Sequence, residues 1–210
     1  MLYDFSLAIL VGRAIALVIG FTIHEFAHAW TAYRLGDKTA YYQGRLTLDP
    51  RAHLEPMGIV LALIVGFGWA KPVPVNPRAF YPNEQRGLML TALAGPMSNL
   101  ILAFLFGFLT RIIEIIGLID NNSFLYITLF TIVLFNIVLF LFNLIPLAPL
   151  DGWKILNGLL PRDQAYQLMQ YERESTFALL LLLMSGFFGI NVLGVIFSPL
   201  IRLLLTLTIG

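Results

Sequence analysis

The chain has 210 residues, of which 59% are hydrophobic and 12% charged, with a formal net charge of +1 at pH 7. A soluble domain typically has about 25% charged residues, so this composition indicates a membrane protein, and the scattered basic residues exclude a nucleic-acid-binding surface. The sequence has no cysteine, which excludes disulfide scaffolds, thiol catalysis and cysteine-ligated zinc, so a metal would be held by His, Asp or Glu.

The first predicted element is a membrane helix over residues 5–33. Between residues 5 and 23 the only charged residue is Arg13. The segment is longer than the roughly 20 residues that a helix needs to cross a bilayer, so we expect it to tilt or to protrude at one end.

Near its end this predicted helix contains the pattern HExxH, at His24, Glu25 and His28. Residues four apart on a helix are separated by only about 40° around its axis, so both imidazoles lie on one face and can bind one metal ion. Zinc suits two histidine nitrogens, and the glutamate can take a proton from a metal-bound water. An ionisable group at bilayer depth costs about 2.5 to 3.5 kcal/mol, so these side chains need a compensating partner. The pattern therefore predicts a water-activating zinc site inside a membrane helix.

Residues 34–86 form a more polar segment. They include seven of the 13 basic residues, namely Arg34, Lys38, Arg45, Arg51, Lys71, Arg78 and Arg86. The positive-inside rule places this segment in the cytoplasm and the N-terminus outside. The metal site would then face the cytoplasmic side.

Three parts of this segment have patterns of their own. Residues 44–48 alternate as a short strand does, and residues 71–77 must be extended because prolines recur at alternate positions. Residues 57–69 are an uncharged apolar run of 13, too short to cross a bilayer. We expect a re-entrant loop or hairpin there, with a surface hairpin as the alternative.

The remaining spans are predicted at residues 88–118, with a kink at Pro96, at residues 124–145 and at residues 176–197. Residues 163–175 are typical of an amphipathic surface helix, and residues 199–209 are apolar but short. The expected fold is a single all-α polytopic membrane domain over residues 1–210, with four to five transmembrane helices, a small membrane-associated β-sheet and a re-entrant loop. Its core covers residues 5–160, and C-terminal helices follow in 161–210.

Asp151 follows the third predicted span. It could cap a helix over residues 152–160. However, a catalytic zinc ion needs three protein ligands, and HExxH supplies two. The predicted topology brings Asp151 to the same cytoplasmic end as His24 and His28, so Asp151 is the best candidate for the third ligand.

Five short motifs occur in order: HEFAH at 24–28, GRLTLDP at 44–50 followed by His53, GWAKPVPVN at 68–76, AGPMSN at 94–99 and NLIPLAPLDG at 143–152. With these motifs the chain resembles the site-2 protease family of intramembrane zinc metalloproteases, in a compact prokaryotic form without PDZ or CBS modules. The resemblance implies one zinc ion held by His24, His28 and Asp151, with Glu25 as the catalytic base. It also implies that Asn143 holds the scissile region or the oxyanion.

The resemblance implies that residues 68–76 hold the substrate within the membrane-associated sheet, and the expected binding residues are Val73, Pro74, Val75 and Asn76. His53 belongs to a recurring motif, and we expect a structural or gating role for it. The implied activity is zinc-dependent cleavage of a peptide bond within or near a transmembrane helix of a membrane-protein substrate.

The expected location is the lipid bilayer of the cell membrane, with the active site toward the cytoplasm. A PDZ or other regulatory partner would be a separate protein. Two alternatives stay open: a divalent-metal transporter, which would need a polar path across both leaflets, and a catalytically inactive membrane binding protein, which would not cleave.

Overall fold

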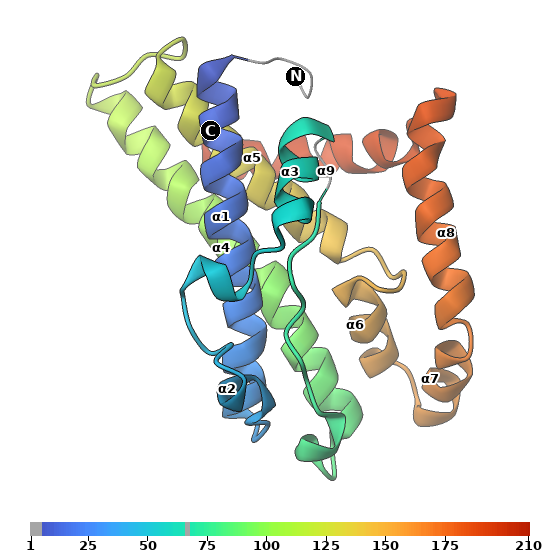
Figure 1. The fold of residues 1–210 in the computed structure, drawn as a ribbon. Coiled ribbons are helices and arrows are strands. Elements are labelled where there is room, and N and C mark those ends of the chain that lie inside the picture. Colours follow the sequence, from blue (N-terminus) through green and yellow to red (C-terminus); the bar gives the residue numbers. More distant parts are fainter. Residues whose placement is uncertain (1–5, 66–67) are drawn as a thin grey trace.

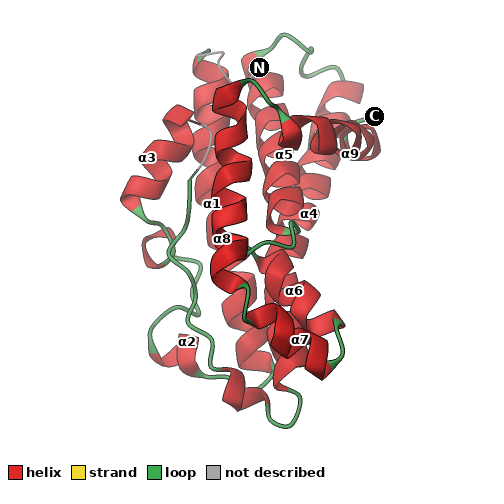
Figure 2. Ribbon diagram, turned by 90° about the vertical axis from the view of Figure 1, so that its right-hand side faces the viewer, coloured by secondary structure: helices red, strands yellow, loops and turns green. Residues whose placement is uncertain are grey.

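The computed structural model describes residues 6–65 and 68–210, and helices dominate this part of the chain (Figure 2). In chain order the elements are α1 (Leu7–Arg34), α2 (Thr39–Tyr42), η1 (Pro50–Ala52), α3 (Pro56–Val65), η2 (Pro77–Phe80), α4 (Glu84–Ile115), α5 (Phe124–Asn143), α6 (Asp151–Leu159), α7 (Arg162–Met169), α8 (Glu172–Met184), η3 (Ser185–Phe188) and α9 (Val192–Thr208). The predicted all-α class is confirmed.

Three of the described helices, α1, α4 and α5, are long and apolar enough to cross a membrane, and they form one bundle (Figure 1). The helix predicted from residue 5 begins at Leu7, where Ser6 caps it by accepting a hydrogen bond from the Ile9 amide. Residue 5 lies outside the described residues. These spans agree with the predicted membrane protein.

Small residues let α1 approach α5 closely. Ala8, Gly12, Ala16 and Gly20 recur at every fourth position of α1 and are all buried. A Cβ atom added at Gly12 would lie 2.7 Å from Cβ of Thr131 on α5. Small side chains at this spacing allow two membrane helices to pack with their backbones near each other. Polar groups on α1, α4 and α5 can therefore meet inside the bundle.

The predicted β-sheet is wrong. Residues 44–48 form no strand: Gly44 ends a turn with φ of 67°, and no described segment pairs with the residues after it. The described residues contain a single isolated antiparallel bridge, between Leu54 and Ala70. Of the predicted extended residues 71–77, residues 71–76 run as an extended chain outside any helix, whereas Pro77 begins η2 (Figure 1). Pro72 and Pro74 lack the N–H groups that a continuing ladder needs. A sheet therefore cannot propagate along them.

The predicted loop or hairpin at residues 57–69 is instead largely a helix, α3, which lies beside α1 (Figure 1). A helix satisfies its own backbone hydrogen bonds, which suits an uncharged apolar run with few polar partners nearby. Residues 66 and 67 of this run lie outside the described residues. Whether α3 enters the bilayer stays a prediction.

The fourth predicted span, residues 176–197, is also wrong as a single helix. The α-helix ends at Met184, η3 follows, and Gly189 closes η3 with a left-handed φ of 77° before α9 begins. As a result α8 has 13 residues and α9 has 17. Both are shorter than the roughly 20 residues of a perpendicular span. The described residues therefore contain three full-length spans rather than four or five. The predicted surface helix at 163–175 is also not a single helix, because its residues are divided between α7 and the start of α8.

The C-terminal helix α9 packs against the bundle. A Cβ atom at Gly107 of α4 would lie 2.7 Å from Cβ of Thr208, and Ile209 belongs to an apolar cluster with Ala103 of α4 and Ile137 of α5. In contrast, α8 stands to one side of α1, α4 and α5 (Figure 1). Between α8 and the bundle lie α6, which begins at Asp151, and the loop that precedes it (Figure 1).

Candidate metal centre

His24 and His28 extend from α1 toward α4 and α6, and Asp151 completes a buried group of three. The two Nε2 atoms lie 3.0 Å apart, and Oδ2 of Asp151 lies 3.1 Å from Nε2 of His24 and 3.2 Å from that of His28. Ligand atoms around a tetrahedral zinc ion, at about 2 Å from it, are themselves roughly 3.3 Å apart. One ligand atom from each residue can therefore bind the same ion.

Asp151 is not a helix cap. It is the first residue of α6, Leu150 holds the N-cap position, and no side chain caps this helix. Burial alone raises the pKa of the Asp151 carboxyl, but His28 and His24 outweigh that effect and keep the pKa below its ordinary value. The carboxylate is the form of this group that binds a metal.

The other ring nitrogen of each histidine is bonded to a fixed acceptor. Nδ1 of His24 donates to Oδ1 of Asn99 at 2.7 Å, and Nδ1 of His28 donates to the Thr91 carbonyl at 2.7 Å. A proton on Nδ1 leaves the lone pair of Nε2 free for a metal. Both histidines are thus held in the tautomer and the ring orientation that zinc requires.

Asn99 is itself supported by two acceptors. Its Nδ2 donates to the Gly20 carbonyl at 3.2 Å and to Oδ1 of Asn136 on α5 at 3.1 Å. Asn99 and Asn136 are both 0% exposed. Sequence reasoning did not assign them to the site, although an amide within an apolar span is the signal that could have found them, because burying it without a partner is costly.

Gly95 lies against the two imidazoles. A Cβ atom there would be 2.4 Å from Cε1 and Nε2 of His28 and 2.7 Å from Cε1 of His24, which is closer than packed atoms approach. The absence of a side chain at Gly95 therefore makes room for the metal site between α1 and α4.

We expect Gly95→Ala to lose zinc, with the affinity reduced by more than about tenfold, because the added methyl group displaces at least one histidine. The measurement is the zinc content of the purified variant. Gly186→Ala is the matched control, since a Cβ atom at Gly186 meets no atom within 4 Å. One tightly held zinc in Gly95→Ala would contradict the described position of α4.

The three candidate ligands line a cavity of about 770 Å³. Glu25 is buried beside them and lines the same cavity. Its Oε2 accepts a hydrogen bond from the Val73 amide at 3.0 Å. Glu25 is not a member of the three-residue group. The structure thus places a carboxylate next to the candidate metal position without using it as a ligand.

The remaining predicted residues are distributed around this cavity. Asn143, Val73 and Val75 line it, whereas Pro74 and Asn76 do not. The Asn76 side chain instead accepts a hydrogen bond from the Arg78 amide at the start of η2.

His53 is 0% exposed and lies apart from the metal group. Its Nε2 donates to the Thr47 carbonyl at 2.8 Å, and its own carbonyl accepts from the Lys71 amide. These contacts connect it to the extended segment.

No family model and no solved structure matches the chain, but curated proteins do. "Putative zinc metalloprotease YwhC" of Bacillus subtilis is 43% identical over 177 residues, covering 80% of this chain and 78% of that protein. "Putative zinc metalloprotease MJ0611" of Methanocaldococcus jannaschii is 32% identical and covers 73% of each chain. "Putative zinc metalloprotease Rip2" of Mycobacterium tuberculosis is 32% identical over 145 residues, and the match spans about half of its length, 54%.

An apolar helical bundle with a buried histidine–aspartate group is typical of a membrane protein with a metal centre, and zinc fits these three ligands. The chain belongs to the zinc metalloprotease family of YwhC and MJ0611, as its resemblance to compact site-2 proteases predicts.

Proposed function

We propose that this protein is an intramembrane zinc endopeptidase, which hydrolyses a peptide bond within or near a transmembrane helix of another membrane protein. The observation that carries the proposal is the buried group of His24, His28 and Asp151, with Glu25 beside it, in a cavity among membrane helices. A hydrolytic site inside an apolar helical bundle suits a substrate that enters from the bilayer.

The proposed chemistry follows from the side chains. Bound to His24, His28 and Asp151, zinc would polarise the scissile carbonyl and lower the pKa of a bound water toward about 7. Glu25 accepts a proton from the attacking water and returns it to the leaving amine. Asn99 holds His24 in position throughout. Asn143, on the cavity wall, is the candidate for holding the scissile region or the oxyanion.

The substrate must be locally unwound, because the carbonyls of an intact helix are already hydrogen-bonded and shielded by side chains. One wall of the cavity is formed by Gly68, Trp69, Ala70, Pro72, Val73 and Val75, and the α8 residues Leu179, Leu180 and Leu183 line it too. Pro72 and Pro74 offer carbonyls but no N–H groups. We therefore propose that the substrate segment binds beside Val73 and Val75 as an extended apolar strand that donates hydrogen bonds.

The test uses purified, zinc-loaded protein in detergent with two substrates that differ at one position of the transmembrane helix. A helix with a central glycine or asparagine should be cut faster than the same helix with leucine. A zinc chelator should abolish the cleavage, and added zinc should restore it. Cleavage that survives complete removal of zinc would contradict the proposal. Uptake of divalent metal into vesicles without any cleavage would support the transporter.

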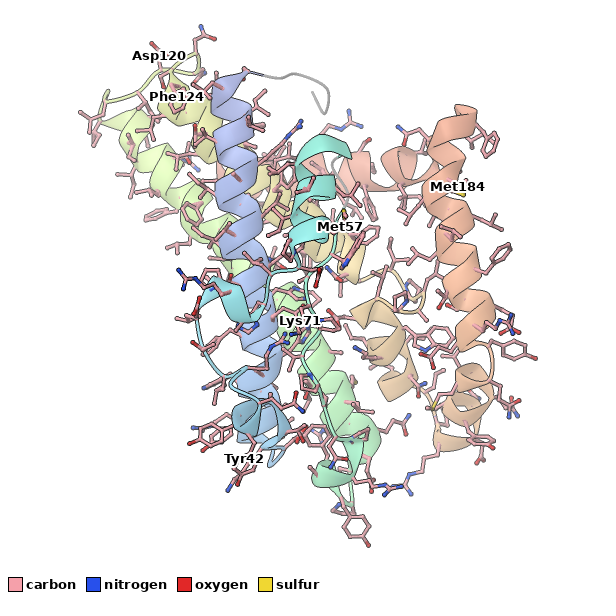
Figure 3. All side chains as sticks on the ribbon, viewed as in Figure 1. Tyr42, Met57, Lys71, Asp120, Phe124 and Met184 are labelled. Atoms are coloured by element: carbon pink, nitrogen blue, oxygen red, sulfur yellow. The ribbon has the colours of Figure 1, made fainter. Side chains whose placement is uncertain are left out.

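We also propose that the basic segment after α1 faces the cytoplasm of the cell, and that any PDZ or regulatory partner acts there as a separate protein. Asp120 and Tyr42 lie at opposite ends of the molecule (Figure 3), so the two ends can be labelled separately. The chain has no native cysteine, and Lys38 and Asn122 are both exposed.

A cysteine at Lys38 is expected to react with an impermeant thiol reagent only from the cytoplasmic side, and one at Asn122 only from outside. The measurement is labelling of intact cells compared with inverted membrane vesicles. The cysteine-free parent is the control for background. The reverse pattern would contradict the orientation proposed for the active site.

A further inference from the structure

Buried charged residues hold the extended segment 71–76 at both ends. The Lys71 amide donates to the His53 carbonyl at 2.7 Å, and the Lys71 carbonyl accepts from Nη2 of Arg45. At the other end, the Asn76 amide donates to Oδ2 of Asp37 at 2.7 Å. Arg45 is 6% exposed and Asp37 is 1% exposed. In the view of Figure 3, Lys71 lies between α1 and α6.

Between these two anchors the segment contacts Glu25. The Val73 amide donates to Oε2 of Glu25 at 3.0 Å. Pro72 and Pro74 have no N–H group, so Val73 is the one backbone donor of these three residues. A carboxylate with one oxygen held in this way keeps a single orientation, and its other oxygen can serve the water. The extended segment is therefore a support for Glu25.

Arg45 suits the anchoring role better than a shorter or neutral side chain would. Its guanidinium is planar and carries several donors in a fixed geometry. Burial lowers the pKa of Arg45, and the negative charge of Glu25 opposes that decrease. The negative charge of Glu25 thus favours the charged form of the guanidinium, while Arg45 also holds the Lys71 carbonyl.

Asp37 is fixed at the opposite end. Its Oδ1 accepts from the amide of Thr39 at 2.9 Å and from the hydroxyl of Thr39 at 2.6 Å. Asp37 follows α1, the helix that also carries Glu25. The extended segment is therefore tied to the α1 end of the bundle as well as to the loop of Arg45.

We propose that Arg45 is a positioning residue for the catalytic base: it holds Lys71 so that the Val73 amide keeps the Glu25 carboxylate directed at the reacting water. Asp37 is the second anchor of the same support. This inference rests on the proposed function, in which Glu25 is the base.

The test compares Arg45→Met, which keeps length but loses charge and donors, with Arg45→Lys. Arg51→Met is the matched control, because Arg51 is exposed in the same stretch of chain. We measure zinc content, kcat and KM, and hydrogen exchange of the amides in residues 71–76. For Arg45→Met we expect one zinc per chain, kcat lower by about 10- to 100-fold, as for other supporting residues, and KM changed less than about twofold. The Val73 amide should exchange faster.

Arg45→Lys keeps the charge and one donor group, so it should recover part of kcat and part of the protection of Val73. If Arg45→Met does not fold, Arg45→Lys decides the question by the same measurements. Parental kcat, or parental exchange at Val73, in the folded variant would overturn the inference. A zinc-loaded parent that cleaves nothing would instead overturn the proposed function, and the exchange measurement would still test the support of Glu25.

Discussion

Glu25→Gln is expected to keep about one zinc per chain and to lose about 10² to 10⁴ of the cleavage rate. Glutamine has the shape of glutamate, and its side-chain oxygen can still accept the hydrogen bond from the Val73 amide. The ligand group of His24, His28 and Asp151 is unchanged. What the variant lacks is a group that takes a proton from water. The measurements are metal analysis and cleavage of a transmembrane substrate in detergent.

The two measurements separate the possible outcomes for Glu25. A variant that cleaves at the parental rate would show that the proposed mechanism is wrong. One that loses zinc would make Glu25 a ligand or a structural support, and the base would have to be sought elsewhere. The alternative of a catalytically inactive binding protein is tested by the unsubstituted protein, which in that case would bind a substrate helix without cutting it.

Asp151→Asn is expected to lose both zinc and activity. The substitution keeps a side chain of the same size but removes the charge that balances zinc beside the two histidines. Removing a residue that merely supports a ligand typically costs about 10- to 100-fold in metal affinity, and loss of a ligand should cost more. Zinc titration of the purified variant, beside the cleavage assay, measures both effects.

Asp163→Asn is the matched control for Asp151→Asn. Asp163 is an exposed acidic residue in the first turn of α7, so its change to asparagine alters the helix end but no ligand. Because α6 has no side-chain cap, the loss of zinc and activity in Asp151→Asn cannot come from a lost helix cap. Full zinc occupancy together with normal proteolysis in Asp151→Asn would show that the carboxylate is not a ligand.

The main features of the membrane bundle were predictable because they depend on local composition and periodicity. The runs that became α1, α4 and α5 are long and apolar, and a long apolar run has few alternatives to a membrane helix. The spacing of His24 and His28 places both rings on one face of any helix that contains them. Asp151 could be selected because a catalytic zinc needs a third ligand and few carboxylates lie at the correct end.

The wrong predictions concern segments where composition leaves two structures close in free energy. Residues 176–197 are apolar enough to span, but α8 gives way to η3 at Ser185, and Gly189 ends η3 in a left-handed conformation. A glycine allows such a break without requiring it. Residues 44–48 alternate as a strand does, yet they have no partner, since a strand is stable only when another chain segment pairs with it.

The sequence by itself determined the class of the protein, its three long spans and the candidate residues of the metal site, since each of these follows from the types and spacing of neighbouring residues. Only the tertiary structure decided what surrounds the site. Asn99 reaches His24 across 75 positions, and the Val73 amide reaches Glu25 across 48. Such contacts depend on how α1, α4 and the extended segment pack, and packing is a property of surfaces that come together only when the whole chain folds.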